Sequence, residues 1–336
     1  MAAYVLDAWY AAAAADEVGT SPLARVLLEE PVVLYRTAAG QPVALADRCV
    51  HRFARLSAGQ VCGDAIACPY HGMRYGPDGA CIAIPGQERI PAQARVRSFP
   101  VLERYGLLFV WMGDPALADP RRLVDIPQYG GSEWGLSRGY ARFECGWRVI
   151  LENLIDPAHT SFVHQRTIGN AAGDSVPLQA RQLGEHTIEC GRWIDNAPAV
   201  PIVQRFANPA GHVDRWQYYY VTPPCTSLVD FGALPTGRPH TPEEQARAPY
   251  RVLSYAFITP VGPASSHYFS FQLRNFAAAD EAVTREFEQL YHETFEEDRL
   301  LLEGVQQAEE RQPAAQPLLI ASDSGVARLR RLLGVG

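Results

Sequence analysis

Two short Cys-His pairs place the strongest constraint on what this chain can fold into. Cys49 and His51 form the first pair, Cys68 and His71 form the second, and sixteen residues separate them. Short β-type runs cut by turn signals surround both pairs, so we expect each pair in a loop between two strands. Four soft or borderline ligands in two neighbouring loops indicate a metal site, which requires a small β domain that brings the loops together.

The distribution of the four residues narrows the kind of metal. Each predicted loop supplies one Cys and one His, whereas zinc fingers of this composition usually pair Cys with Cys and His with His. The mixed arrangement is that of a Rieske [2Fe–2S] centre, in which two thiolates hold one iron and two imidazoles hold the other. A zinc site and ordinary core positions remain as alternatives at this point.

A second set of candidate ligands lies in the stretch ENLIDPAHTSFVH, which we expect to be mainly helical. Asn153, Asp156 and His159 follow one another at three-residue steps and would share one helix face. His164 lies five residues after His159, so both histidines can bind one ion only if the helix is distorted between them. Pro157 gives a reason for such a distortion, because it removes a backbone donor and disfavours helical geometry at the preceding residue.

A carboxylate that completes this set is expected on a long helix over residues 280–311. Asp298 falls on the apolar stripe of that helix, seven residues after Tyr291, whereas Glu296 and Glu297 are predicted to point into solvent. Two histidines and one carboxylate on one face of an iron leave positions open for oxygen and substrate. The competing interpretation of Asp298 is a salt bridge to an arginine of the core.

Composition limits the remaining possibilities. The chain has 336 residues, of which 47% are apolar, enough for two domains, and we place them at residues 1–125 and 126–336. A net charge of −7 argues against nucleic acid as a partner. The sequence contains neither a run of about eighteen apolar residues nor a basic leader, which predicts a cytoplasmic protein without a membrane span.

The motifs CVHR and CPYHG, together with ENLIDPAHTSFVH and FEEDRLLLE, resemble those of the Rieske non-heme iron oxygenases. The resemblance covers nearly the whole chain and is strongest to terminal oxygenase subunits of the vanillate O-demethylase, toluenesulfonate methyl-monooxygenase and dicamba demethylase type. One departure is Val50, where the family usually has proline. The implied fold class is α+β, with an N-terminal all-β Rieske domain and a C-terminal, helix-grip-like catalytic domain whose antiparallel sheet is covered by helices.

The resemblance also implies two metal centres. The residues matching the ligands of the [2Fe–2S] cluster are Cys49, His51, Cys68 and His71. The residues matching the ligands of a mononuclear Fe(II) are His159, His164 and Asp298. Asn153 matches a residue near that iron, and Asp156 matches a bridging carboxylate between His159 and the Rieske histidine His71 of a neighbouring subunit, which implies a homotrimer.

The implied activity is a monooxygenase reaction on a methyl or methoxy group of a small aromatic acid. It would use O₂ and electrons from NAD(P)H, which reach the chain through a flavin or iron–sulfur reductase or a ferredoxin. O-demethylation would release formaldehyde and a phenol, and methyl hydroxylation would give an alcohol. Two alternatives stay open: a Rieske hydroxylase or N-demethylase of a non-aromatic or heterocyclic substrate, and an electron carrier without catalysis.

The substrate pocket is the least determined part of the sequence. Strand alternation sends Trp216 to one face of its strand, and His267, Phe269 and Phe271 together to one face of another. We expect these faces to line an aromatic pocket, with His267 or Arg274 meeting a carboxylate or sulfonate. The competing interpretation of each aromatic side chain is an ordinary position in the sheet core.

Overall fold

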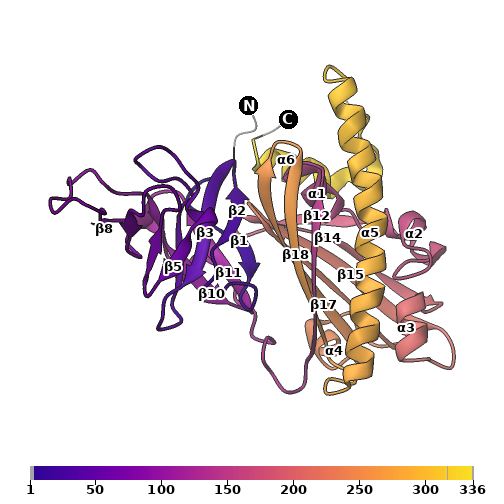
Figure 1. The fold of residues 1–336 in the computed structure, drawn as a ribbon. Helices are drawn as coiled ribbons and strands as arrows, with labels where there is room; N and C mark the ends of the chain where they lie inside the picture. The colour runs from indigo at the N-terminus through magenta and orange to yellow at the C-terminus, as the bar shows by residue number, and fades with distance from the viewer. Residues whose placement is uncertain (1–3, 316, 335–336) are drawn as a thin grey trace. The chain divides into compact units, whose positions relative to one another are not determined.

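The computed structural model describes residues 4–315 and 317–334, which form two compact units. The first unit extends to Asp125 and includes Thr259–Gly262, and the second contains Ile126–Ile258 and the chain from Pro263 onward. Figure 1 shows β-strands in the earlier part of the chain, and a sheet with a long helix in the later part. The first unit is built from strands and the second from an antiparallel sheet with helices, so the predicted α+β class is confirmed.

The first unit consists of three small antiparallel sheets. One sheet has the order β1-β11-β10, the second β2-β3-β4-β9 and the third β5-β6-β7-β8. The strands are β1 (Ala8–Ala14), β2 (Leu23–Leu27), β3 (Glu30–Arg36), β4 (Pro42–Ala46), β5 (Gln60–Cys62), β6 (Ala65–Ala67), β7 (Arg74–Tyr75), β8 (Cys81–Ala83), β9 (Ser98–Phe99), β10 (Val101–Arg104) and β11 (Leu107–Met112). The 3₁₀ turn η1 (Leu56–Ala58) lies between β4 and β5, and the 3₁₀ turns η2 (Pro115–Leu117) and η3 (Pro120–Arg122) follow β11.

The strands of the first unit form where β-branched and aromatic residues cluster, as in EPVVLYR of β3. Their inward side chains build a core that includes Tyr35, Ile66 and Tyr75. Cys49 and Cys68 belong to the same core, with 1% and 3% of their surfaces exposed. The two candidate cysteine ligands are therefore anchored in packed apolar surroundings rather than displayed on a flexible surface loop.

The second unit is organised around one seven-stranded sheet of order β12-β18-β17-β16-β15-β14-β13. The strands are β12 (Gly135–Phe143), β13 (Gln179–Leu183), β14 (Thr187–Ala197), β15 (Val213–Thr222), β16 (Thr226–Pro235), β17 (Tyr250–Gly262) and β18 (Ser265–Arg274). Strands β13 to β18 follow one another as a meander, and β12 closes the order at the edge beside β18. Successive side chains therefore alternate between the two faces of this sheet.

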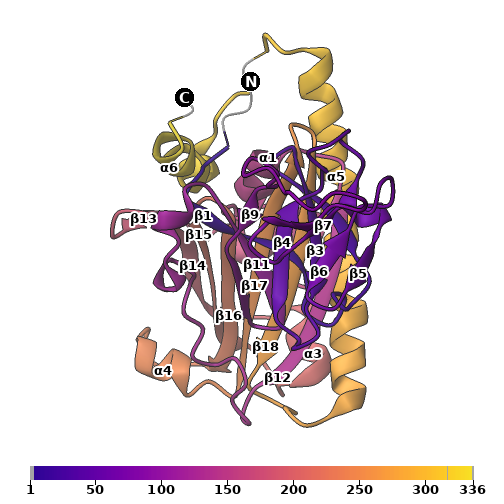
Figure 2. The ribbon, with the colours of Figure 1, turned by 60° about the vertical axis from the view of Figure 1, so that its left-hand side comes forward.

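Helices pack against this sheet in the second unit. They are α1 (Trp147–Asn153), α2 (Thr160–Val163), α3 (Pro201–Phe206), α4 (Pro242–Ala246), α5 (Glu281–Arg311) and α6 (Ser324–Leu332), with 3₁₀ turns η4 (Ala171–Gly173) and η5 (Ala321–Asp323). Helix α5 begins at the N-cap Asp280, whose side chain accepts hydrogen bonds from two backbone amides, as capping chemistry predicts. Phe287 and Tyr291 pack into the sheet core, and Figure 2 shows α5 running alongside the sheet. Among the described residues, no helix is long and apolar enough to cross a membrane.

The expected helix through the ENLIDPAHTSFVH stretch is broken. Helix α1 ends at Asn153 and α2 begins at Thr160, so Asn153, Asp156 and His159 do not share a helix face. The distortion predicted at Pro157 is confirmed and is larger than expected. Pro157 disfavours helical geometry at Asp156, and the Asp156 side chain accepts a 2.8 Å hydrogen bond from the backbone amide of Ala158, which holds the intervening turn.

Candidate metal centres

The two Cys-His loops of the first unit share one backbone design. In each loop the amide of the cysteine donates to the carbonyl five residues later, and the amide four residues later donates to the cysteine carbonyl, at 2.8–3.0 Å. The residue at that fourth position has a positive φ, 59° at Phe53 in the first loop and 71° at Gly72 in the second. Glycine adopts this conformation readily because it has no Cβ atom, which suits Gly72 to the tight turn of the second loop.

This design separates the four side chains into a buried pair and an exposed pair. Cys49 and Cys68 point into the core, and burial followed by the neighbouring Cys49 thiol raises the pKa of Cys68. His51 and His71 are exposed, and their ring centroids lie 4.5 Å apart. Two buried thiols beside two adjacent imidazoles at the surface fit a cluster that has one thiolate-bound and one imidazole-bound iron.

Val50 has a specific partner in this loop. Its backbone amide donates to the Tyr75 hydroxyl at 3.3 Å, and that hydroxyl lies 3.1 Å from the Sγ atom of Cys49. A proline at position 50 would have no amide hydrogen to donate. The departure from the family pattern therefore adds a polar contact that reaches a candidate cluster ligand.

The second group of candidate ligands converges in the second unit. His159 and His164 lie at the two ends of the short helix α2, and Asp298 lies on the buried side of α5. The Nε2 atoms of His164 and His159 are 3.1 and 3.7 Å from Oδ1 of Asp298. The three donor atoms lie within 4.8 Å of one another, although some 130 residues of sequence separate His164 from Asp298. Below, these three residues are called the triad.

Hydrogen bonds on the far side of each ring determine which nitrogen faces the triad centre. The Nδ1 of His159 donates to the backbone carbonyl of Asp156, and the Nδ1 of His164 donates to Oε2 of Glu297 at 2.9 Å. Both Nε2 lone pairs therefore point toward Oδ1 of Asp298, a buried carboxylate oxygen without a hydrogen-bond partner among the described residues. Three converging acceptors without a shared proton fit a divalent metal ion bound by two histidines and one carboxylate.

The electrostatic surroundings of the two imidazoles differ. Burial lowers the pKa of His159, and only part of this effect is offset by the Asp298 charge. Burial also opposes protonation of His164, but the nearby carboxylates of Asp298 and Glu297 outweigh it and raise the pKa of His164. The Nδ1 atom of His159 thus contacts a neutral carbonyl, whereas the Nδ1 atom of His164 contacts a carboxylate.

Two expectations about α5 need correction. Glu297 does not point into solvent: its side chain is 21% exposed and is bonded to His164. It lies one position from Asp298 on the helix, about 100° around the axis, where its longer side chain reaches α2. Glu296, as predicted, lies outside and pairs with Arg299. Asp298 has no arginine partner among the described residues, so the salt-bridge interpretation is not met.

Family models and relatives match both halves of the chain. A model of the Rieske [2Fe–2S] domain matches residues 8–100, and a model of the vanillate O-demethylase oxygenase C-terminal domain matches residues 143–334. This chain belongs to the Rieske non-heme iron oxygenases. The predicted family is confirmed, and the interpretations as a zinc protein or as an electron carrier without catalysis are not retained.

The relatives include oxygenase components of several multicomponent systems. The oxygenase is 36% identical to a toluene-4-sulfonate monooxygenase system iron–sulfur subunit of Comamonas testosteroni, over 98% of this chain and 96% of that protein. It is 33% identical to a vanillate O-demethylase oxygenase subunit of Pseudomonas sp. strain HR199, over 97% and 93%. A crystal structure of dicamba monooxygenase bound to 3,6-dichlorosalicylic acid superposes with a TM-score of 0.92 at 29% identity, over 99% and 97% of the two chains.

The family defines the cofactors of the oxygenase. It uses a Rieske [2Fe–2S] cluster, a mononuclear non-heme iron and O₂, and NAD(P)H serves it indirectly. As the oxygenase component of a multicomponent system, it receives electrons from a reductase or ferredoxin partner. The cofactors expected from the resemblance are thus confirmed.

A small cavity of about 40 Å³ lies beside the triad. Its other walls are mainly aromatic and aliphatic side chains, among them Tyr219, Val229, Phe231, Tyr268, Tyr291 and Phe295. Tyr219 belongs to β15 and Tyr268 to β18, the two strands on which the sequence predicted a pocket. Tyr268 lies between His267 and Phe269, two residues that we expected there, so the opposite face of β18 faces the triad.

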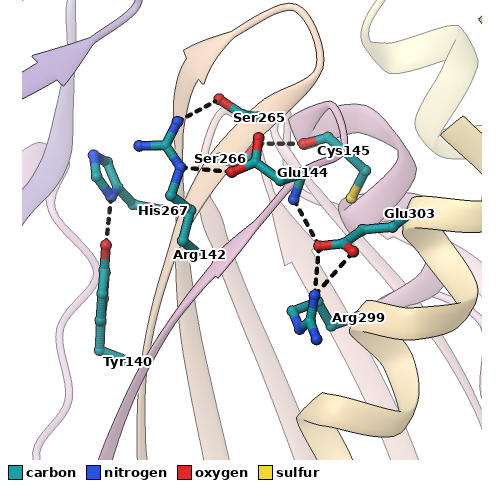
Figure 3. Close-up of polar contacts among 9 residues, drawn as sticks. All are labelled: Tyr140, Arg142, Glu144, Cys145, Ser265, Ser266, His267, Arg299 and Glu303. Carbon is teal, nitrogen blue, oxygen red and sulfur yellow. Dashed lines mark hydrogen bonds and ion pairs between the residues drawn. The ribbon is translucent and has the colours of Figure 1, made fainter. Parts of the chain in front are cut away.

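The predicted substrate residues of β18 are accordingly elsewhere. His267 and Phe269 both contact Tyr140 of β12, at 2.9 Å between His267 Nδ1 and the Tyr140 hydroxyl and at 5.0 Å between the Phe269 and Tyr140 rings. Phe271 packs against Tyr255 on the same side. Figure 3 shows the His267–Tyr140 pair beside polar contacts that join β12, β18 and α5. A two-residue period identifies two faces but does not reveal which one covers the site.

Trp216 and Arg274 are also occupied in other ways. The Trp216 ring stacks on Trp193, and its Nε1 donates to Asp230 at 3.0 Å, although the residue borders a second cavity of about 20 Å³. Arg274 is fully buried and donates to Thr284 and to backbone carbonyls at the start of α5. Neither Arg274 nor His267 lines the cavity beside the triad.

Neither Asp156 nor Asn153 lines the cavity beside the triad. The backbone carbonyl of Asp156, and not the expected carboxylate, holds the His159 ring. Burial raises the pKa of the Asp156 carboxyl group. The turn that carries Asp156 is attached to the sheet by Gln217 of β15, whose side-chain amide donates to the Pro157 carbonyl at 3.2 Å.

Proposed function

We propose that the oxygenase oxidises a methyl or methoxy group of a small aromatic acid. Its first unit would hold the cluster through Cys49, His51, Cys68 and His71, and its second unit would hold the mononuclear iron through His159, His164 and Asp298. The observation that carries the proposal is the placement of the triad at the wall of a small, aromatic-lined cavity. Relatives named for toluene-4-sulfonate, vanillate and dicamba support an aromatic acid as the substrate.

The side chains of the second unit would contribute positioning and exclusion of water. When bound, the iron supplies the site of oxygen activation, and the cluster supplies the electrons. Tyr219, Phe231 and Tyr268 would hold the aromatic ring so that its methyl carbon faces the triad, and would keep bulk water away from the reacting atoms. The Asp156 carbonyl and Glu297 would keep both imidazoles in the orientation that binds metal.

Assembly into a homotrimer is part of the same proposal. His51 and His71 are exposed, and a neighbouring subunit could therefore approach the imidazole side of the cluster. The Asp156 carboxylate would be the group that meets the neighbour's His71. A mass in solution of about three times 37.0 kDa is expected for the loaded protein. We place the protein in the cytoplasm, since all seven cysteines are unpaired, as is usual in a reducing compartment.

Substrate-dependent turnover tests the proposal. The loaded oxygenase, with a reductase and NADH, would be supplied with toluene-4-sulfonate, with methoxybenzoates and with N-methylated heterocycles. Expected results are an alcohol product from the sulfonate or formaldehyde from the methoxybenzoates, in step with O₂ consumption. Coupled O₂ consumption with only the N-methylated heterocycles would instead establish the N-demethylase alternative.

A further inference from the structure

Two buried arginines lie side by side on the sheet face that carries the cavity. Arg192 of β14 and Arg215 of β15 are 5% and 4% exposed. Arg215 and Tyr219 are four residues apart on β15 and therefore point to the same face, and Arg192 pairs with Gln217 between them. Both guanidinium groups thus lie on the side of the sheet where Tyr219 contributes to the wall of the triad cavity.

The partners of these arginines are neutral. Arg192 donates to the backbone carbonyls of Gly173 and Val176, and Arg215 donates to Oδ1 of Asn170 at 2.7 Å. Neither arginine forms an ion pair within the described part of the chain, and both Nε atoms are buried without a hydrogen-bond partner there. A buried cation without a counter-charge is costly and is normally paired.

The free-energy cost of burying this unpaired charge is reflected in the pKa of Arg215. Burial, and then the like charge of Arg192, lowers the pKa of Arg215 to about 10. Among the carboxylates, Asp174 acts in the opposite direction, and it is exposed. The guanidinium of Arg215 would therefore be stabilised by any anion that reached it.

The two cavities indicate how an anion could reach Arg215. The second cavity, of about 20 Å³, is lined by Arg215 and shares Ile168, Tyr219, Val229 and Phe231 with the triad cavity. None of the triad residues lines the second cavity, so Arg215 lies at the end away from the metal. Both volumes are far below the roughly 300 Å³ of a small ligand site, so the shared side chains must move apart when a ring enters.

We propose that Arg215 binds the anionic group of the substrate, a carboxylate or sulfonate on a benzene ring. This assignment rests on the proposed function and makes it more specific. The ring would lie between the shared walls formed by Tyr219 and Phe231, and the methyl or methoxy carbon would face the triad. The planar guanidinium fork matches two oxygens of one carboxylate or sulfonate, and lysine would not reproduce that match. Arg192 remains bonded to its two carbonyls and supports the positive field.

Matched pairs of anionic and neutral ligands test this assignment without relying on turnover. The probes are toluene-4-sulfonate against toluene-4-sulfonamide, and 4-methoxybenzoate against 4-methoxybenzamide. Calorimetric titration of the loaded full chain would give dissociation constants for wild type, Arg215→Gln, Arg215→Lys and the control Arg181→Gln. Arg181 is a suitable control because it lies on the edge strand β13, is largely exposed and pairs with Glu189.

The expected result is a loss specific to the anions. Arg215→Gln should weaken binding of both anions by about 10- to 100-fold and change amide binding by less than about threefold. Arg215→Lys should recover part of the loss, and Arg181→Gln should behave as wild type. The absorption of the cluster and the circular dichroism would verify that each variant is folded.

Three outcomes would overturn the assignment: equal loss of anion and amide binding in Arg215→Gln, an unchanged anion-to-amide ratio, or no binding of either anion by wild type. The proposed function fails in a different way. If wild type binds the anions through Arg215 and never oxidises them while O₂ and electrons are supplied, the anion site stands and the proposed reaction is wrong.

Discussion

The two candidate metal sites of this oxygenase are built in opposite ways. The site in the first unit comes from one short part of the chain, Cys49 to His71, and leaves its imidazoles exposed. The triad joins residues far apart in sequence, and its imidazoles are only 13% and 1% exposed, beside a small cavity. A centre that exchanges electrons with other proteins benefits from an exposed edge, whereas oxygen chemistry on a bound ring requires exclusion of water. The difference shows how one chain separates electron delivery from reaction.

If the two metal sites are independent, removing one should leave the other intact. The largest effect on iron content and turnover is expected from substitution of Asp298. Asp298→Ala deletes the carboxylate from a buried donor set. We expect iron to fall from about three to about two per chain, with two sulfides retained and turnover abolished. Elemental analysis and visible absorption would check this result, with Glu296→Ala as the exposed control from the same helix. Simultaneous loss of the cluster would show that the two metal sites are not independent.

Asp156 tests whether the two sites communicate through the turn before α2. Asp156→Asn removes a charge but retains the backbone carbonyl that holds His159. Turnover should fall by about 10- to 100-fold while iron and sulfide contents stay at the wild-type level. Stopped-flow measurement of cluster oxidation in the presence of substrate would locate the defect between the centres. A parallel loss of mononuclear iron would indicate that the carboxylate is needed for metal binding instead.

Glu297 tests whether the hydrogen bond to the His164 ring supports metal binding at the buried site. Glu297→Gln weakens the acceptor that orients the His164 ring, so affinity for the mononuclear metal should fall by about tenfold. Titration of iron-depleted protein with Co²⁺, followed by its visible bands, measures that affinity apart from activity. Glu296→Gln changes an equal charge one residue away and should leave the affinity unchanged. An identical effect of both variants would mean that helix charge, not the contact with His164, is responsible.

The smallest effect is expected at the candidate cluster site of the first unit, from removal of the Tyr75 hydroxyl beside Cys49. Its hydroxyl accepts from the Val50 amide and can therefore donate to the Cys49 sulfur. Hydrogen bonds to cluster sulfurs favour the reduced state, so Tyr75→Phe should lower the midpoint potential by roughly 40 mV, the one-electron equivalent of about 1 kcal/mol. Voltammetry of the loaded protein measures the shift. A potential that does not change would show that the hydroxyl makes no net contribution to the cluster.

The sequence predicts the local features of both sites better than the long-range ones. The Cys-His loops are specified within a few residues, and the break between α1 and α2 follows from Pro157. Asp298 could be found because a carboxylate on an apolar helix stripe needs a partner. Glu297 could not, because its burial depends on α2, which folds from a distant part of the sequence. No local signal separates the two Glu side chains that precede Asp298.

The substrate side was the hardest to predict. Alternation in β18 gave the correct period, yet Tyr268 and not His267 lines the cavity. The sequence does carry a signal at Arg215: this residue occupies a face of β15 that its neighbours identify as buried, where a charged side chain is unusual. Only the packed sheet shows that this arginine has neutral partners and borders a space continuous with the triad walls.

One face of β15 carries three of the contacts described above. Arg215 borders the far cavity, Gln217 holds the turn that precedes His159, and Tyr219 forms part of the wall near the metal. Each two-residue step along a strand spans about 6.8 Å. Strand β15 therefore sets the distance between Arg215, which would bind the anion, and the carbon that would react. This distance restricts how long an acceptable substrate can be.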